Sequence, residues 1–175
     1  MDIDLKHHIR SVPDFPKKGI VFRDITTLLK DREAFGRAID VFYERYKSQR
    51  IDKIVSVESR GFIFGSALAQ KLGAGFVPIR KPGKLPAETI REEYQLEYGK
   101  DAVEIHKDAI SPGEHILVHD DLLATGGTVL AACRLVERLG GKIAGLCFLI
   151  ELSFLHGRDR LKNYDIYSIV TYDSE

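Results

Sequence analysis

Short apolar runs along this chain take turns with segments in which apolar residues recur every three or four positions. The runs at 53–57, 75–80, 115–119, 142–150 and 166–170 predict strands, and the longer periods at 62–72 and 127–139 predict helices. Another helix is predicted after Asp31, whose side chain can accept hydrogen bonds from the first free N–H groups. This alternation indicates an α/β fold with a central, mostly parallel sheet flanked by helices. Ligands of such sheets bind outside the carboxyl ends of the strands.

The remaining segments interrupt this alternation. A short amphipathic helix is predicted at the N-terminus, then an extended entry at Pro13 and Pro16, and a short helix that Asp24 can cap. The stretch 81–92 is predicted to be irregular, with strands near 94–98 and 102–106. The chain has 175 residues, 44% of them hydrophobic, and no visible repeat or linker, so residues 1–175 are predicted to form a single domain.

Charge and hydropathy narrow the classes of partner. Lys and Arg total 26, as do Asp and Glu, so the chain has no net field that would hold a nucleic acid. No apolar stretch approaches the ~20 residues that span a bilayer. Residues 1–10 contain no apolar signal core, so we expect a cytoplasmic protein with no membrane partner. Cys133 and Cys147 are expected to be buried thiols; a disulfide or a catalytic role is the alternative.

The run V-H-D-D-L-L-A-T-G-G-T at 118–128 is the most informative segment. It leads from an apolar strand through Asp120 and Asp121 into a turn of small residues, and a helical pattern follows at once. Such a junction directs N–H groups and the positive end of a helix dipole at one point, which predicts a phosphate site. Because carboxylates repel phosphate, the acidic pair is expected to face sugar hydroxyls or a magnesium ion on the same ligand. The alternative is an ordinary strand-to-helix turn with incidental acids.

A second strand–turn–helix junction lies at Glu58-Ser59-Arg60-Gly61, and it predicts a second anion site to which Arg60 adds charge. Arg80, Lys81 and Lys84 form a cationic cluster in the connection after the next strand. Two alternatives remain open here. Arg60 could pair with a surface carboxylate, and the cationic cluster could be a solvated loop.

Together these segments resemble the type I phosphoribosyltransferases, and the form D-D-L-L-A-T-G-G-T is typical of the adenine phosphoribosyltransferases among them. Four further segments are similar, in the expected order: F-P-K-K-G-I-V-F-R-D-I at 15–25, V-E-S-R-G-F at 57–62, R-K-P-G-K-L-P at 80–86 and L-E-Y-G at 96–99. The similarity covers nearly the whole chain. His119 departs from the pattern, since the family usually has an aliphatic residue there; we expect a structural histidine.

The resemblance implies the type I phosphoribosyltransferase fold, with a small hood and a mobile flap at 85–98 that closes over the substrate. It implies transfer of the 5-phosphoribosyl group from 5-phosphoribosyl 1-diphosphate to adenine in purine salvage, giving AMP and diphosphate. Mg²⁺ would be held mainly by substrate oxygens and water, and the enzyme would be a homodimer. The catalytic residues would be Glu97, Asp120 and Asp121. The substrate-binding residues would be Val21, Phe22, Arg23, Glu58, Ser59, Arg60, Arg80, Lys84, Tyr98, Ala124, Thr125, Gly126, Gly127 and Thr128.

The implied roles follow the chemistry of the ligands. Phe22 would cover one face of a purine, and the backbone of Val21 and Arg23 would read its edge. Loop 58–61, which in the family often contains a non-proline cis peptide, would bind the diphosphate. Three roles are open for Glu97: taking the proton from the attacking ring nitrogen, steadying positive charge at the ribose, or holding a ribose hydroxyl. The alternative is a solvated flap charge.

Two other functions remain open from the sequence. One is the same chemistry on another base, such as hypoxanthine, guanine or xanthine. The other is a regulator that keeps the fold to sense the sugar diphosphate and binds nucleic acid. The regulator would need a DNA-binding segment or a basic face, and the sequence suggests neither.

Overall fold

The computed structural model describes residues 4–95 and 99–175. Its strands are β1 (Arg10–Val12), β2 (Phe22–Asp24), β3 (Lys53–Val57), β4 (Gly75–Ile79), β5 (Thr89–Gln95), β6 (Lys100–His106), β7 (His115–Leu123), β8 (Lys142–Leu152) and β9 (Ile166–Tyr172). Its α-helices are α1 (Thr26–Leu29), α2 (Arg32–Tyr46), α3 (Gly61–Leu72) and α4 (Gly127–Arg138). Three short 3₁₀ turns complete the described elements: η1 (Leu5–His8), η2 (Ser153–Leu155) and η3 (Gly157–Arg160).

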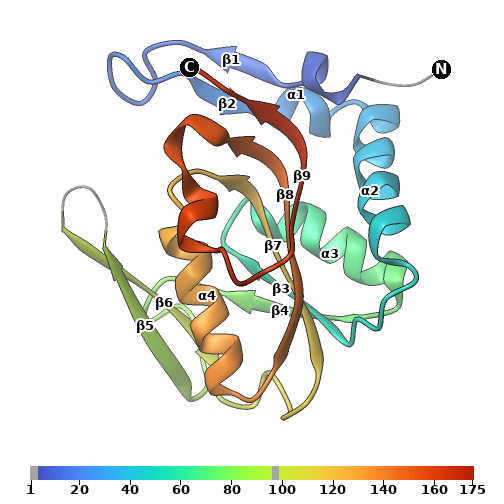
Figure 1. Ribbon diagram of the computed structural model, residues 1–175, viewed down its shortest axis with the longest axis vertical. Coiled ribbons are helices and arrows are strands. Elements are labelled where there is room, and N and C mark those ends of the chain that lie inside the picture. The colour runs from blue at the N-terminus through green and yellow to red at the C-terminus, as the bar shows by residue number, and fades with distance from the viewer. Residues whose placement is uncertain (1–3, 96–98) are drawn as a thin grey trace.

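A five-stranded sheet forms the centre of the molecule. Its strand order is β4-β3-β7-β8-β9, and every neighbouring pair is parallel (Figure 1). Because parallel neighbours need a crossover, the chain passes through α3 between β3 and β4 and through α4 between β7 and β8. The α/β fold with a central parallel sheet is thereby confirmed.

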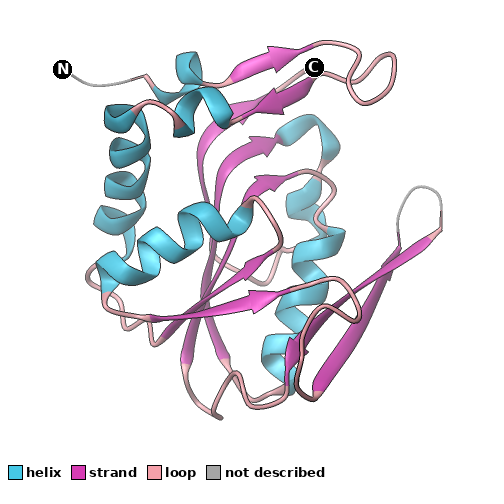
Figure 2. Ribbon diagram, turned by 180° about the vertical axis from the view of Figure 1, so that it is seen from behind, coloured by secondary structure: helices cyan, strands magenta, loops and turns pink. Residues whose placement is uncertain are grey.

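Helices cover both faces of this sheet. Helices α2 and α3 lie on one face and α4 lies on the other (Figures 1 and 2). Successive residues of β7 therefore enter different cores, since side chains alternate along a strand. Leu117 packs with Phe42 and Phe64 from α2 and α3, whereas Val118 packs with Val136 from α4. Both faces of the sheet are buried, as the unbroken apolar runs predicted.

Two small antiparallel sheets flank the large one. Strands β1 and β2 pair from Arg10↔Asp24 to Val12↔Phe22. With α1 they form a hood beside the ends of β8 and β9 (Figure 1). Strands β5 and β6 form a hairpin that lies beside α4. Residues 96–98, which follow β5 in the sequence, fall outside the described residues.

The hairpin corrects one prediction. The stretch 81–92 is not irregular throughout, because Thr89–Gln95 is a regular strand paired with β6 along its whole length. Its inward positions are Ile90, Glu92 and Tyr94. The charged Glu92 interrupts the apolar alternation, and it faces inward because Arg134 and Arg138 of α4 both donate to it, each at 3.2 Å.

Strand β7 corrects a second prediction. It continues to Leu123 instead of ending at 119, because Leu122 and Leu123 pair with Ile150 and Glu151 of β8. The acidic pair at 120–121 therefore lies within a strand and not in the loop that follows. The predicted N-terminal helix is the single 3₁₀ turn η1. No helix within 4–95 and 99–175 is long and apolar enough to cross a membrane.

Candidate active site

The turn between β7 and α4 forms a small cradle. Gly126 has φ of 80°, which favours glycine, and its carbonyl oxygen accepts from Leu130 N at 3.0 Å as α4 begins. A cavity of about 80 Å³ lies against this turn, lined by Asp120 and by residues 122–129. Backbone N–H groups at the start of a helix favour an anion. The geometry therefore fits the predicted phosphate loop at 124–128.

A segment that the sequence did not single out supports this turn. A Cβ atom on Gly126 would lie 2.7 Å from the carbonyl oxygen of Gly157, so the two backbones are in direct contact. The next residue, Arg158, donates to both carboxylate oxygens of Glu151 at 2.6 and 2.7 Å, and Glu151 is only 4% exposed. This ion pair holds the 153–160 segment against the phosphate loop. In the sequence, the one sign of this support is Glu151, an acidic residue directly after the apolar run 142–150.

The acidic pair meets Arg60 of the other predicted anion loop. Arg60 Nε donates to Asp121 Oδ2 at 2.6 Å, and Asp121 is 5% exposed. Burial, together with the neighbouring charge of Asp121, raises the pKa of Asp120 well above its usual range. Arg60 thus pairs with an acid of the site itself and not with a surface carboxylate. This contact joins the predicted anion loop after β3 to the carboxyl-terminal part of the adjacent strand β7.

The carboxylate of Glu58 binds the cationic residues that are predicted to bind the diphosphate. Its carboxylate accepts from the backbone N–H of Lys81 at 2.5 Å, from Lys84 Nζ at 3.1 Å and from Arg80 Nη2 at 3.2 Å. Burial acts to raise the pKa of Glu58, but these three bonds outweigh it and lower the pKa. The Glu58–Ser59 peptide is cis, as the resemblance implied. The cationic cluster is therefore held against the 58–61 loop and is not a free solvated loop.

Lys81 attaches the same cluster to the hairpin. Its Nζ donates to Asp101 and, at 3.0 Å, to the hydroxyl of Tyr94. Glu104 adds a bond to the backbone N–H of Gly83 at 3.1 Å. The predicted flap residues Glu97 and Tyr98 lie outside the described residues, so their roles stay predictions.

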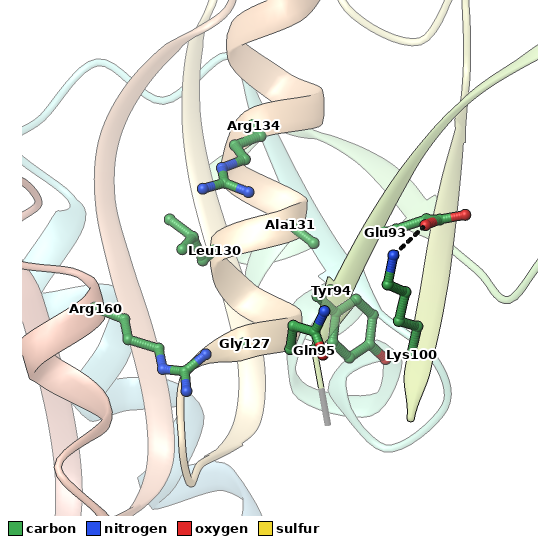
Figure 3. Close-up of a pocket in the computed structure, with 9 residues that line it drawn as sticks. All are labelled: Glu93, Tyr94, Gln95, Lys100, Gly127, Leu130, Ala131, Arg134 and Arg160. Atoms are coloured by element: carbon green, nitrogen blue, oxygen red, sulfur yellow. Dashed lines mark ion pairs between the residues drawn. The ribbon is translucent and has the colours of Figure 1, made fainter. Parts of the chain in front are cut away.

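A larger cavity, of about 280 Å³, is lined by the end of the hairpin and by the first turns of α4 (Figure 3). Its lining residues are Glu93, Tyr94, Gln95, Lys100, Gly127, Leu130, Ala131, Arg134 and Arg160. Gly127 belongs to both this cavity and the phosphate cradle. The end of the hairpin therefore lies against Gly127 in the predicted phosphate loop, and the cavity lies beside this contact.

The predicted base-binding segment lies on the hood. The ring of Phe22 is 5.0 Å from the guanidinium carbon of Arg60 and stands edge-on to Phe15, with ring centroids 5.2 Å apart. Phe22 therefore borders the acidic pair through Arg60. The side chain of Arg23 is 8% exposed and contacts the C-terminal strand, so only its backbone can face a base.

His119 is buried on the α2–α3 face of β7. Its ring stands edge-on to Phe42 at 5.3 Å, Nδ1 is 3.4 Å from Cys147 Sγ, and Nε2 has no partner among the described residues. Burial lowers the pKa of His119 to about 3. The predicted structural role agrees with this environment, and Cys133 and Cys147 are both buried free thiols, as predicted.

Acid should destabilise the fold through His119. The folded chain keeps this ring neutral down to about pH 3, whereas the unfolded chain protonates it below about pH 6.5. The unfolded state then binds more protons, so stability is complete above pH 6.5 and falls as the pH decreases, by ~2 kcal/mol at pH 5. His119→Leu is expected to remove this contribution to the dependence of the free energy of unfolding on pH, measured by urea unfolding between pH 7 and 4.5. The control is His156→Asn, because this residue is exposed and asparagine tolerates its φ of 54°; it should keep the wild-type slope. An H119L slope equal to the wild type would contradict the assignment.

Comparisons with known proteins agree with this geometry. Residues 24–173 match the family described as the phosphoribosyl transferase domain. The chain is 57% identical to an adenine phosphoribosyltransferase of Koribacter versatilis, covering 97% of this chain and 93% of the relative. A crystal structure of the Thermoanaerobacter pseudethanolicus enzyme of that name matches with a TM-score of 0.94, at 53% identity over 97% of this chain and 98% of that one. The Saccharomyces cerevisiae enzyme, crystallised with an imino-altritol bisphosphate and adenine, matches with a TM-score of 0.90 at 43% identity, covering 94% of this chain and 96% of that one.

The chain is therefore a phosphoribosyltransferase by its fold and by its sequence similarity to that family. Within that class it belongs to the adenine phosphoribosyltransferase family.

Proposed function

We propose that this enzyme makes AMP and diphosphate from adenine and 5-phosphoribosyl 1-diphosphate by holding the sugar diphosphate between the loops that follow β3 and β7. The observation that carries the proposal is the Arg60–Asp121 ion pair, which joins the loop after β3 to the end of β7 beside Phe22. The phosphate cradle lies on one side of this pair and the Glu58 cluster on the other. A ligand with phosphates at both ends of a ribose fits that order.

Each end of the ligand has its own residues. The loop of Ala124, Thr125, Gly126, Gly127 and Thr128 would hold the 5-phosphate, and Asp120 and Asp121 would hold the ribose hydroxyls. Ser59, Arg60, Arg80 and Lys84 would neutralise the diphosphate as it leaves. Because Glu58 pairs with Arg80 and Lys84, an arriving diphosphate would compete with this carboxylate for them. Orientation and charge stabilisation then supply most of the rate acceleration.

Magnesium fits this donor set. Adjacent carboxylates are oxygen ligands of the kind Mg²⁺ prefers, and the raised pKa of Asp120 marks a place where a cation would relieve repulsion. Substrate oxygens and water would hold most of the ion's coordination sites, next to Asp120 and Asp121 at the ribose hydroxyls. Bound there, it would offset the negative charge of the diphosphate.

The base would lie on the hood. Phe22 would cover one face of adenine, and the backbone at Val21 and Arg23 would bond its edge. A carbonyl that accepts from the 6-amino group would oppose a keto oxygen on hypoxanthine or guanine. The purine ring nitrogen would then attack the anomeric carbon as the diphosphate departs.

The hairpin would act as the lid. The cavity lined by its end and by α4 leaves room for the 85–98 flap to close, and closure excludes water from a ribosyl centre that water would hydrolyse. Glu97 and Tyr98 would come from this flap. We further propose a cytoplasmic homodimer in which the exposed Phe15, Ile20 and Ile63 are covered by the partner.

A purine panel tests the base assignment. With the sugar diphosphate and Mg²⁺ saturating, kcat/KM for adenine should exceed that for hypoxanthine or guanine by roughly 10–100-fold, since an unmatched buried carbonyl costs about 1–3 kcal/mol. Product nucleotides would be separated and quantified by chromatography. Comparable values for adenine and hypoxanthine would reject the base site and leave the sugar site standing.

A further inference from the structure

The side chain of Arg23 is anchored on the C-terminal strand. Its guanidinium carbon is 3.9 Å from the ring centroid of Tyr172, at the end of β9. Nη1 donates to Ser11 Oγ at 2.5 Å and Nη2 donates to the carbonyl oxygen of Ser174 at 3.3 Å. Arg23 and Tyr172 are 8% and 9% exposed. Three segments, β1, β2 and the C-terminus, thus meet at one guanidinium group.

The strand that carries Arg23 has few other attachments. β2 contains three residues and pairs only with β1, and an isolated two-stranded sheet is marginally stable. Its neighbour Phe22 points to Arg60, on the side of the anion loops, while Arg23 points to Tyr172. The backbone between these side chains is therefore held between the anion loops and the end of β9.

Packing alone does not account for an arginine at this position. No described carboxylate pairs with Arg23, and its buried Nε has no partner in the described part of the chain. Burying a guanidinium without a counter-charge is costly, and an apolar side chain would fill the space at less cost. Only arginine, however, stacks on an aromatic ring and donates two directed bonds from one rigid plane. The group is thus suited to fixing a position.

We propose that Arg23 is a positioning residue for base recognition, and that Tyr172 and Ser174 are its anchor. Through this contact the end of β9 sets where the backbone of β2 stands relative to the ribose site. The inference rests on the proposed base site, since it is the backbone of Val21 and Arg23 that would bond the purine edge. If the backbone of β2 were displaced, adenine would bind more weakly. The affinity for the sugar diphosphate would not change, because other loops bind it.

The test compares steady-state constants for both substrates in the variants Arg23→Lys, Tyr172→Leu and Tyr172→Phe. In R23K and Y172L the KM for adenine is expected to rise about tenfold, the equivalent of losing one or two such contacts, with less than about twofold change in the KM for the sugar diphosphate. The ratio of kcat/KM for adenine to kcat/KM for hypoxanthine should fall in the same two variants. Y172F keeps the stacked ring and should recover wild-type values.

Arg45→Lys is the matched control. Arg45 also lies over tyrosine rings, 5.7 Å from that of Tyr167, and donates to Asp165 at 2.7 Å, away from the base segment. It should leave both KM values unchanged. A chain ending at Asp173 lacks Ser174 and Glu175, and with them the carbonyl acceptor of Arg23, so its KM for adenine reports on the anchor even where R23K does not fold.

Three results would overturn the proposal. The first is an unchanged KM for adenine in folded R23K and Y172L, when the wild type prefers adenine to hypoxanthine. A wild type without that preference would instead reject the proposed base site. The second is an equal rise in both KM values, which would indicate general loosening. The third is a fall in kcat that follows the melting temperature, with KM for adenine constant, which would leave Arg23 a purely structural role.

Discussion

Replacing Asp120 or Asp121 with asparagine is expected to lower kcat by roughly 10²–10³-fold, the range found when one preorganised charge-stabilising group is removed from an active site. Both carboxylates lie at the carboxyl-terminal part of β7 beside Arg60, where the ribose would be held. Asparagine keeps the shape and removes the charge. Turnover would be measured with both substrates and Mg²⁺ saturating.

The two substitutions should differ in stability. Asp121→Asn takes the counter-charge from Arg60, so its melting temperature should fall, whereas Asp120→Asn relieves a repulsion and should not lower it. The exposed Asp108 supplies a control, since Asp108→Asn should change neither property. A folded double variant that turns over at nearly the wild-type rate would remove both aspartates from the ribose site.

Glu97→Gln is expected to lower kcat by roughly 10²-fold, at the lower end of what a positioned proton-transferring or charge-bearing group supplies. As a base or as a charge stabiliser, Glu97 would act more strongly in the transition state than in the ground state, whereas a ribose ligand would mainly change the KM of the sugar diphosphate. In either of the first two roles, KM should therefore change less than kcat. Single-turnover rates of AMP formation would separate this chemical step from product release.

Glu88→Gln provides the matched control for that experiment. Glu88 belongs to the same segment, its side chain is 82% exposed, and it pairs with Lys107 at 3.0 Å. Its removal should leave kcat unchanged. Equal values of kcat for E97Q and wild type would make Glu97 a solvated charge of the flap.

Much of the fold was predictable because the relevant patterns are local. The buried runs at 53–57 and 142–150 read as strands without ambiguity, and Asp31 caps α2 by accepting from Glu33 N and Ala34 N, at 3.0 and 2.9 Å. The turn at 124–128 was equally visible, since a strand, a glycine turn and a helix follow one another within a few residues. Local patterns of this kind do not depend on what the rest of the chain does.

The features that the sequence did not predict depend on distant partners. In the sequence, Glu92 is typical of an exposed loop residue. Its inward position depends on Arg134 and Arg138 of α4, which donate hydrogen bonds to its carboxylate. Likewise, the pairing of Arg60 with Asp121 joins a loop to a strand that lies 61 residues further along the chain, and their separate motifs gave no sign of it. The support of Gly126 by the 153–160 segment is a backbone contact, for which no residue type is a marker.

A crystal structure with the sugar diphosphate, Mg²⁺ and 9-deazaadenine would test the central claim most directly, since a purine with carbon at position 9 cannot react through a ring nitrogen there. We predict the 5-phosphate on the N–H groups of 125–128, the ribose hydroxyls at Asp120 and Asp121, and the diphosphate beside Arg60, Arg80 and Lys84. The base should lie on Phe22, with its amino group bonded to the backbone of the hood. A sugar diphosphate bound away from the β3 and β7 loops, or a base away from Phe22, would contradict this account.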